Sequence, residues 1–542
     1  MRTTEHKPHI VFIVLDTHRA DRMGCYGYAR GTTPNLDAFA QAATVYEEAI
    51  APAQWTIPSH ASMFSGEPPS VHMVVQSGDV LDSRFKTLAE LLHGNGYRTV
   101  GFCNNPLVGV INNGFRRGFE NFYNYGGAIP SGLDRPSRPL LAPFSAARKR
   151  FVKALHRISY SIQDVFATSR QMFQAALKPF WVPLWTRFAN FKGDTRASIE
   201  DVAYFVRQHM GEGDAPCFLF LNLMETHLPF SAPKKFVDTF APYLREDRQA
   251  RHFMQAFNAQ AARWITPMEK PFDELEARTL GDMYDAEVAY QDHLLAPLLD
   301  LLDQPERRDN TLVIFVADHG EMLGEHQLIG HAFGVYQELI HVPLLVRAPA
   351  QTTGHRVTGP VSATRLFHTV LDVAGIAPYA ADGSHPADSN SPMGHGPAVD
   401  VRSQSLLREG NGGHRSQPET LQAVLSEAYA PEFALAVTEA QQPHLLEQRD
   451  CRATRRAVYG GRHKLIQVEN ARYELFALDT DPRETHSLAD ETEATRVREV
   501  IRGRLEAFLE EAKARRSGRR EQRKAEAEDE AVRQRLRHLG YF

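Results

Sequence analysis

Short, continuous apolar runs that alternate with longer helical stretches constrain this chain more than any other feature. The runs are rich in β-branched residues: IVFIVL at 10–15, TVGF at 99–102, CFLFLNL at 217–223, TLVIFVA at 311–317 and PLLVRAP at 343–349. Strands that are apolar on both faces and separated by helices are typical of a parallel sheet with helices on both sides. The sequence therefore predicts a doubly wound α/β/α sandwich.

Three of these runs are followed by side chains that can bind ligands. Asp16 follows the first run, Glu225 and His227 follow the third, and Asp318 and His319 follow the fourth. In sheets of this kind the functional site lies beyond the carboxyl ends of the strands. We therefore expect these side chains to contribute to one site at that edge of the sheet.

The composition excludes several other classes of protein. The 542 residues contain 61 Lys and Arg against 66 Asp and Glu, so the chain lacks the positive field of a nucleic-acid binder. Four scattered cysteines favour a reducing compartment. The N-terminus shows no apolar signal core, and no apolar run reaches the roughly 18 residues that span a bilayer. We expect a folded cytoplasmic protein that binds no nucleic acid.

The chain divides into two parts. Residues 1–400 hold the apolar runs and are predicted to form the larger α/β domain, which carries the site at the strand ends. A polar stretch rich in Gly and Pro, from about 380, is typical of a long surface loop. Residues 401–542 then contain short strand-like runs and a charged tail. We expect a smaller α+β subdomain there, with a small antiparallel sheet and a terminal helix.

A basic, aromatic insertion at 126–200 interrupts the first part. Residues 139–192 contain nine Lys or Arg, one Asp and ten aromatic residues. Apolar residues recur there at helical spacing, which favours a helical lid or a dimer face. Because a basic amphipathic helix can also lie on an anionic membrane, peripheral membrane contact and a lipid-linked substrate are the alternative interpretation. The sequence leaves the oligomeric state open.

The segment TIPSH at 56–60 predicts a helix start. A hydroxyl residue just before Pro at an early helical position places Thr56 at or near the N-cap, where free amides favour an anion. By itself this pattern is typical of an ordinary capped helix. A Thr hydroxyl is a poor nucleophile unless a cation or a base stabilises its alkoxide. Asp16, Asp318 and His319 could hold such a cation.

Five segments in order resemble the sulfatase family of the alkaline phosphatase superfamily, and the resemblance runs from the first strand to the C-terminal part. They are LDTHRADRMGCYGYARGTTPNLDAFA at 15–40, TIPSHASMFSGEPPSVH at 56–72, YDAEVAYQD at 284–292, VADHGEMLGEHQLIGHAFGVYQELIHVPLLV at 316–346 and RHKLIQVENARYELFALDTDPRETHSLAD at 462–490. The resemblance implies an ester hydrolase with the family's α/β/α fold.

The resemblance also implies a divalent-cation site. Asp16, Asp318 and His319 fall at the family's metal-ligand positions. Thr56 occupies the position of the catalytic residue, which in sulfatases is a Cys oxidised to formylglycine, and it completes the ligand set. Two carboxylates, one hydroxyl and one imidazole form a mostly oxygen site, which favours Mn, Mg or Ca over Zn.

Catalytic roles for three histidines follow from the same resemblance. His60 stands where the family motif has Arg. His227 and His331 fall where the family places groups that contact the ester oxygens or the leaving group. An alternative is that Glu225, His227 and His331 hold a second metal, or that Glu225 supports another ligand. We expect one metal.

The chain departs from the family pattern at several positions. Thr17 replaces the second acidic ligand, and GFCNNP at 101–106 replaces the G-K-W-H segment. Thr56 replaces the modifiable Cys, so no formylglycine is expected. Cys451 begins a loose C-x-A-x-R pattern, but it lies downstream of every ligand segment and is not a substitute.

The Thr at position 56 shapes the predicted function. A Thr adduct cannot collapse to an aldehyde, so water or another acceptor must attack its central atom, and phosphoryl adducts suit that step. Within the superfamily, Thr here resembles phosphodiesterases, phosphonate ester hydrolases and phosphoglycerol transferases. We predict a metal-dependent hydrolase of a phosphate or phosphonate ester or diester with Thr56 as nucleophile. The alternatives are a sulfuric ester hydrolase, a phosphoglycerol-type transferase and an inactive anion-binding protein.

Overall fold

The structure is a computed structural model that describes residues 7–127, 130–133, 191–211, 213–376, 401–408, 424–469 and 472–538. From residue 517 onward it describes the backbone of the last helix and not its side chains. Most of the basic insertion, including residues 134–190, lies outside the described residues. The lid, dimer-face and membrane-contact interpretations of that segment therefore stay predictions.

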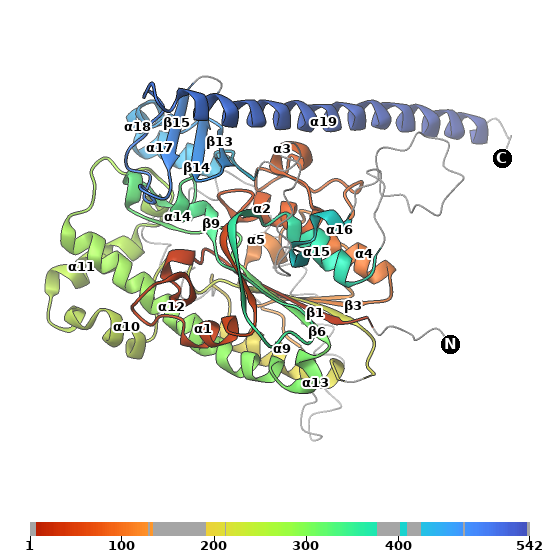
Figure 1. Ribbon diagram of the computed structural model, residues 1–542, viewed down its shortest axis with the longest axis horizontal. Helices are drawn as coiled ribbons and strands as arrows, with labels where there is room; N and C mark the ends of the chain where they lie inside the picture. Colours follow the sequence, from red (N-terminus) through yellow and green to blue (C-terminus); the bar gives the residue numbers. More distant parts are fainter. Residues whose placement is uncertain are drawn as a thin grey trace.

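A mostly parallel sheet forms the centre of the molecule (Figure 1). The strand order is β11-β2-β10-β6-β1-β5-β3-β4, and β9 pairs with β2. Strands β1 (His9–Leu15), β5 (Cys217–Leu223) and β6 (Thr311–Val316) lie side by side, run parallel and are buried at every residue. The continuous apolar runs thus form the central strands of a sheet covered on both faces, as predicted from the sequence.

The outer strands complete a mixed sheet. They are β2 (Thr44–Ile50), β3 (Arg98–Cys103), β4 (Asn121–Asn124), β9 (His341–Val342), β10 (Leu344–Arg347) and β11 (His355–Ser362). The run at 343–349, expected among the parallel strands, instead forms β10 and pairs antiparallel with both β6 and β2. The chain leaves β6 at the carboxyl edge of the sheet and re-enters from that same edge, so β10 must run in the opposite direction.

Alternate residues of β1 show how both faces of the sheet are covered. Its even-numbered residues pack in one apolar cluster with α2, α4 and α15, and its odd-numbered residues pack in a second cluster with α1, α9 and α12. The first layer is α2 (Thr56–Ser65), α4 (Leu88–Gly94) and α15 (Arg365–Val373), and the second is α1 (Pro34–Ala40), α9 (Thr195–His209) and α12 (Glu274–Leu302). Figure 1 shows these two layers on opposite sides of the sheet, which confirms the α/β/α sandwich.

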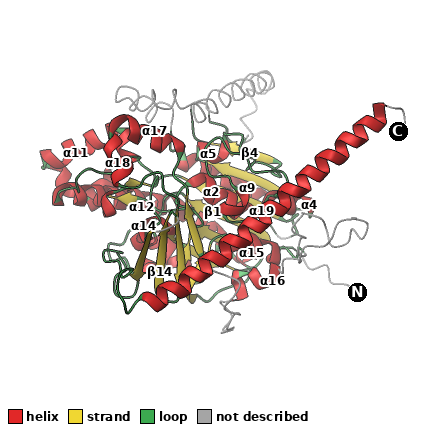
Figure 2. Cartoon of the chain, turned by 90° about the horizontal axis from the view of Figure 1, so that it is seen from above, coloured by secondary structure: helices red, strands yellow, loops and turns green. Residues whose placement is uncertain are grey.

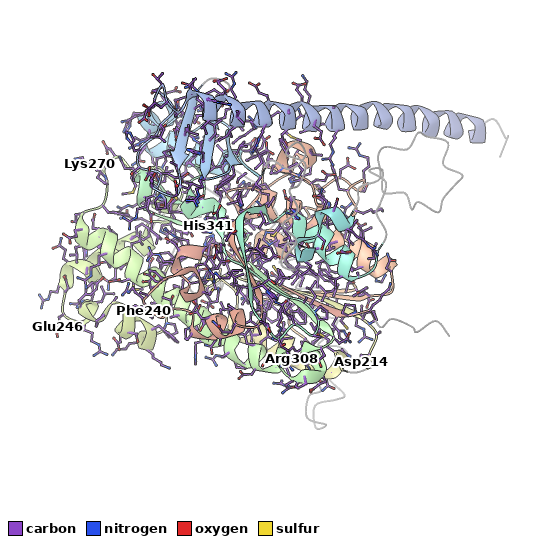
Figure 3. The ribbon with its side chains drawn as sticks, viewed as in Figure 1. Asp214, Phe240, Glu246, Lys270, Arg308 and His341 are labelled. Carbon is purple, nitrogen blue, oxygen red and sulfur yellow. The ribbon has the colours of Figure 1, made fainter. Side chains whose placement is uncertain are left out.

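Shorter elements surround this core. They are α3 (Pro69–His72), α5 (Pro106–Gly109), α10 (Lys234–Phe240), α11 (Arg248–Ala259), α13 (Pro305–Arg308), α14 (Gln337–Ile340), α16 (Val401–Gln404), β7 (Met322–Leu323) and β8 (Ile329–Gly330). Side chains fill the space between the layers, and charged residues such as Glu246 and Lys270 lie at the periphery (Figure 3). Within the described ranges, no helix is both long enough and apolar enough to cross a membrane.

The C-terminal part forms a separate antiparallel sheet, which confirms that prediction. Its strands, in spatial order, are β12 (Leu425–Ala428), β13 (Arg455–Gly460), β14 (His463–Val468) and β15 (Arg472–Ala477). The same part of the chain contains three helices: α17 (Glu432–Gln441), α18 (Pro443–Gln448) and α19 (Thr495–His538). Figure 2 shows α19 crossing the molecule and extending past the other elements. We propose a domain boundary near residue 400, next to residues 377–400 that lie outside the description.

Candidate active site

Two carboxylates meet at the carboxyl edge of the sheet because their strands are parallel neighbours. Asp16 directly follows β1, and Asp318 follows β6 after one intervening residue. The strand register pairs Val14 with Val316, so the two side chains leave the sheet at almost the same level. Both aspartates are completely buried. The structure thus brings together these two strand-exit residues, as the sequence predicted.

His319 and Thr56 complete this cluster. Nε2 of His319 lies 3.4 Å from Oδ2 of Asp318, 3.9 Å from Oδ1 of Asp16 and 3.3 Å from the hydroxyl of Thr56. The Nδ1 of His319 lies 2.9 Å from the carbonyl oxygen of Gly320. Because a carbonyl only accepts, Nδ1 carries the proton and Nε2 presents its lone pair to the cluster. Thr56 is the first residue of α2, one position after the N-cap.

The donor set fits a divalent cation. Within the described part of the chain, Oδ1 of Asp16 and Oδ2 of Asp318 are buried with no hydrogen-bond partner. Leaving such an oxygen unsatisfied is costly, and a cation is a partner that would satisfy both. One ligand atom from each of Asp16, Asp318 and His319 lies within 4.8 Å of the others. A group of mostly oxygen donors favours Mn, Mg or Ca.

The raised pKa values of the two aspartates are also expected of cation ligands when no cation is bound. Burial raises the pKa of Asp16 to about 6, although hydrogen bonding to Asn105 and the charge of His331 oppose the rise. Burial and the neighbouring Asp16 raise the pKa of Asp318 well above its ordinary value. The positive charge of a bound cation would reverse both shifts.

Two buried asparagines belong to the site, although the sequence did not single them out as site residues. Nδ2 of Asn105 donates to Oδ2 of Asp16 at 2.6 Å, and its Oδ1 caps α5. Asn222, near the end of β5, places its Nδ2 3.4 Å from Nε2 of His60. Both follow from the rule that strand ends carry the site, because β3 and β5 are parallel neighbours. The sequence singles out residues 101–106 only because they replace the family's G-K-W-H segment, and this difference does not indicate a role for Asn105.

Thr17 stands where an acidic ligand was expected, and its backbone forms part of the turn that follows Asp16. Its φ of 59° is left-handed, which is unfavourable for a β-branched residue. The Tyr284 hydroxyl donates to the carbonyl of Thr17 at 2.7 Å and accepts from the amide of Arg19 at 2.9 Å. Residue Tyr284 of α12 therefore holds the turn that follows Asp16.

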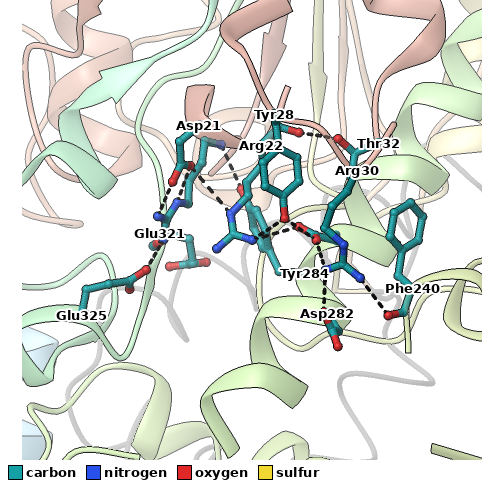
Figure 4. A network of polar contacts seen from close by, with 12 residues as sticks. Asp21, Arg22, Tyr28, Arg30, Thr32, Phe240, Asp282, Tyr284, Glu321 and Glu325 are labelled. Carbon is teal, nitrogen blue, oxygen red and sulfur yellow. Dashed lines mark hydrogen bonds and ion pairs between the residues drawn. The ribbon is translucent and has the colours of Figure 1, made fainter. Parts of the chain in front are cut away.

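A network of ion pairs fastens the same loop to its surroundings (Figure 4). Arg22 and Arg30 both pair with Asp285 on α12, at 3.1 and 2.5 Å. Arg19 pairs with Glu325, in the segment that follows Asp318, at 2.8 Å. The segments at 15–40 and 284–292, which carry the family resemblance, thus contact each other in the structure.

His60 lies on α2 in contact with Thr56 and Asp318. Its Nδ1 lies 2.9 Å from the carbonyl of Thr56 and 3.4 Å from Oδ2 of Asp318. The ring packs among Phe64, Phe115 and Phe220. Burial lowers the pKa of His60 to about 4, so the ring is neutral near pH 7. The structure gives His60 contacts that position Thr56 and Asp318.

His331 and His227 extend the site away from the aspartates. The ring of His331 lies 4.5 Å from that of His319 and 5.0 Å from that of His227, between centroids. Nδ1 of His331 donates to Oε1 of Glu321 at 2.7 Å, and Nδ1 of His227 donates to the Leu228 carbonyl at 2.6 Å. In both rings Nε2 is the nitrogen left for a ligand.

The environments of these two imidazoles differ. Burial would lower the pKa of His331, but the buried Glu321 carboxylate outweighs it and raises the pKa above its ordinary value. Burial and the positive charge of His331 lower the pKa of His227 well below its ordinary value. Neighbouring groups with opposite shifts suit the roles of acid and hydrogen-bond acceptor.

Comparisons with known proteins agree with the fold. A family model described as Sulfatase matches residues 8–376. The uncharacterized sulfatase YidJ of Escherichia coli (strain K12) is 22% identical over 382 residues, which cover 68% of each protein. The multifunctional alkaline phosphatase superfamily protein PehA of Trinickia caryophylli is 25% identical over 427 residues, which cover 70% of this chain and 76% of PehA.

Solved structures resemble this chain over nearly its whole length. The phosphonate monoester hydrolase of Agrobacterium radiobacter aligns with a TM-score of 0.61 and 22% identity, covering 93% of this chain and 96% of that one. The phosphonate monoester hydrolase SpPMH from Silicibacter pomeroyi aligns with a TM-score of 0.59 and 20% identity, covering 92% and 96%. At these identities the likeness shows the fold.

Proposed function

The chain belongs to the sulfatase family and is a hydrolase of that family, and from this premise we propose that it cleaves a phosphate or phosphonate ester or diester with Thr56 as nucleophile. One observation carries the proposal. The Thr56 hydroxyl lies 3.3 Å from Nε2 of His319, beside the carboxylates of Asp16 and Asp318. A hydroxyl placed among candidate cation ligands at the start of a helix is suited to attack a bound anionic ester.

The residue at position 56 favours phosphorus over sulfur as the central atom. Thr cannot become formylglycine, so its adduct must be resolved by attack of water or another acceptor, and phosphoryl groups undergo such in-line displacement readily. The names of two phosphonate monoester hydrolases of the same fold support this choice. A small anionic ester is the proposed substrate.

The proposed metal ligands are Asp16, Thr56, Asp318 and His319. A divalent cation held there would lower the pKa of the Thr56 hydroxyl and offset the negative charge of the ester. The amides and the positive dipole end at the start of α2 also favour the ester's anionic oxygens. His60 and Asn105 keep Thr56 and Asp16 in position through the contacts described above.

The chain's own residues account for the bond changes. Oγ of Thr56 attacks the phosphorus as the alkoxide, the bond from phosphorus to the leaving oxygen breaks, and Nε2 of His331 donates a proton to that oxygen. Water then attacks the phosphorus and returns a proton to His331, while the bond to Thr56 breaks and Oγ leaves again as the alkoxide. Nε2 of His227, whose other nitrogen donates to Leu228, accepts a hydrogen bond from the attacking water.

Sulfuric ester hydrolysis is the alternative function, because YidJ and further relatives of the chain are named as sulfatases. Transfer to an alcohol would use the same first step with a different acceptor. The lipid-linked substrate, the membrane contact and the cytoplasmic location stay predictions from the sequence.

A paired turnover assay tests the proposal. Chelator-stripped and Mn-reconstituted protein is assayed with the nitrophenyl phosphate monoester, phosphodiester, phosphonate ester and sulfate. We expect metal-dependent release from a phosphorus ester at a rate well above that from the sulfate. Preference for the sulfate would establish the alternative, and no release together with no bound metal would indicate an anion-binding protein without activity.

A further inference from the structure

The loop that carries His227 is held at both of its ends. It runs from Glu225, just after β5, to Ser231, shortly before α10. Nζ of Lys192 donates to the main-chain carbonyl of Glu225 at 2.6 Å. The main-chain amide of Ser231 donates to Oε1 of Glu287 on α12. His227 lies between these two anchoring contacts.

Lys192 and Glu287 join the two anchors to each other. Nζ of Lys192 lies 3.1 Å from Oε1 of Glu287, the same oxygen that accepts from Ser231. The Lys192 side chain is 12% exposed and the Glu287 side chain 1%. Burial raises the pKa of Glu287, while the positive charge of Lys192 opposes the rise. A buried pair of this kind has few alternative partners, so it fixes the geometry of whatever it binds.

The residues next to Lys192 reach the site as well. The ring of Phe191 contacts that of His227, with 5.5 Å between centroids and an angle of 71° between planes. Oγ1 of Thr195 accepts from Asn104, which follows β3, at 2.8 Å. Segment 191–195, in the last part of the insertion, is therefore fastened to the ends of two neighbouring strands.

We propose that the Lys192–Glu287 pair is a positioning device for the proposed reaction: it holds loop 225–231 so that His227 presents Nε2 to the attacking water. Lys192 acts through the loop and does not contact the reacting atoms. The proposal rests on the proposed function of His227. It also gives the described end of the insertion a role, since Phe191 contacts the ring of His227 and Lys192 contacts the loop that carries it.

The chain offers a matched control in a second buried pair. Nζ of Lys464, on β14, lies 2.6 Å from Oε1 of Glu484, and both side chains are fully buried. Glu484 also groups with His326 and Glu338, in an arrangement that could hold a cation. The Lys464 ammonium already supplies the positive charge there, so this second group is not a metal site in our account. Breaking this pair also disturbs a buried Lys–Glu contact, but neither residue of the pair contacts loop 225–231 in the interactions described above.

Hydrogen–deuterium exchange tests the positioning directly in the full-length protein. In the Lys192→Met and Glu287→Ala variants, we expect the amides of loop 225–231 to exchange about tenfold faster. Glu287→Gln, which keeps an acceptor for the Ser231 amide, should show a smaller increase. Lys464→Met should leave exchange in this loop unchanged. Wild-type exchange in both disruptive variants would overturn the proposal.

Kinetics then test whether the pair acts through His227. We expect Lys192→Met to lower kcat by about tenfold to a hundredfold with little change in KM, because a small misplacement of a catalytic group has effects of this size. In a His227→Asn background the same change should have no further effect. An equal loss in both backgrounds would contradict action through His227. If His227→Asn keeps the wild-type kcat, the proposed role of His227 fails, whereas the exchange data still decide whether the pair holds the loop.

Discussion

The hydroxyl of Thr56 lies 3.3 Å from Nε2 of His319, although 263 positions separate the two residues in the chain. One stands at the start of α2 and the other shortly after β6. Their proximity unites the helix start, which favours an anion, with the aspartates at the strand ends, which favour a cation. A site that combines these two preferences is suited to ester cleavage with a hydroxyl nucleophile.

Replacing Thr56 with Ala should abolish turnover and leave metal content largely intact. The change removes the proposed nucleophile, so kcat should fall by about a thousandfold or more. Asp16, Asp318 and His319 remain to bind the cation. Thr56→Ser, which keeps a hydroxyl, should retain part of the activity. Turnover by the Ala variant at the wild-type rate would show that another group is the nucleophile.

Metal removal should lower both activity and thermal stability. A cation that binds only the folded protein stabilises it by about 2.7 kcal/mol at a hundred times its dissociation constant. Differential scanning calorimetry with and without Mn should therefore show a higher unfolding temperature with the metal. An unchanged temperature, together with unchanged turnover after chelation, would rule out the proposed cation site.

Replacing Asp318 with Asn should remove the metal effect and stabilise the metal-free protein. The Asn Oδ1 can still accept from the amides of Thr17 and His319, as Asp318 does at 3.4 and 3.0 Å. The substitution removes a buried carboxylate whose ionisation burial disfavours. We expect a higher unfolding temperature than that of metal-free wild type, and no further rise with Mn. A rise with Mn equal to that of wild type would exclude Asp318 as a ligand.

His331→Asn should slow cleavage most for esters with poor leaving groups. A proton donor contributes about a hundredfold to ten-thousandfold when the leaving oxygen is basic, and little when it leaves readily as nitrophenolate. The dependence of kcat on the leaving-group pKa should therefore become steeper in the variant. Glu321→Gln, which keeps an acceptor for Nδ1 of His331, should give a smaller change in the same direction. A loss equal for all leaving groups would argue against proton donation.

The Arg19–Glu325 pair should make stability depend on pH. Burial would raise the pKa of Glu325, but the charge and hydrogen bond of Arg19 outweigh it and hold the pKa below its ordinary value. A depressed pKa contributes stability above the unfolded-state value of about 4.3, and the contribution is lost as the pH falls. Glu325→Gln should thus cost about 1–2 kcal/mol at pH 7 and less toward pH 3.

Urea unfolding at both pH values measures this difference. Glu306→Gln is the control, because its side chain is half exposed and its contact with Arg307 should contribute little at either pH. A cost of Glu325→Gln that stays constant between pH 7 and pH 3 would contradict the assignment to an ionised Glu325.

The central strands and the aspartates could be predicted because both depend on local patterns. Apolar runs buried on both faces identify β1, β5 and β6, and the residue after such a run lies at the carboxyl edge of the sheet. Asp16 and Asp318 follow from that rule alone. The same rule indicates His319, and the helix start at 56–60 indicates Thr56. The family resemblance added the roles of these two residues in one site with the aspartates.

Other features depend on contacts between distant segments and could not be predicted. The strand-end rule places Asn105 at the correct edge of the sheet, but its contact with Asp16 depends on β3 and β1 flanking β5, and no spacing in the sequence reveals that order. The antiparallel direction of β10 follows from the path of the chain across the site. Lys192 looked like one of many cations in a basic insertion, and its contact with Glu287 gives it a distinct role.

The central claim, that Thr56 forms a bond to phosphorus, is tested most directly by trapping the adduct. The Mn-loaded protein is mixed with a nitrophenyl phosphonate ester, quenched in acid within the first turnover and digested for mass spectrometry. Our account predicts that the peptide containing Thr56 gains the mass of the phosphonyl group, and that fragmentation places the group on Thr56. An unmodified Thr56 peptide, with the group on another residue during normal turnover, would contradict it.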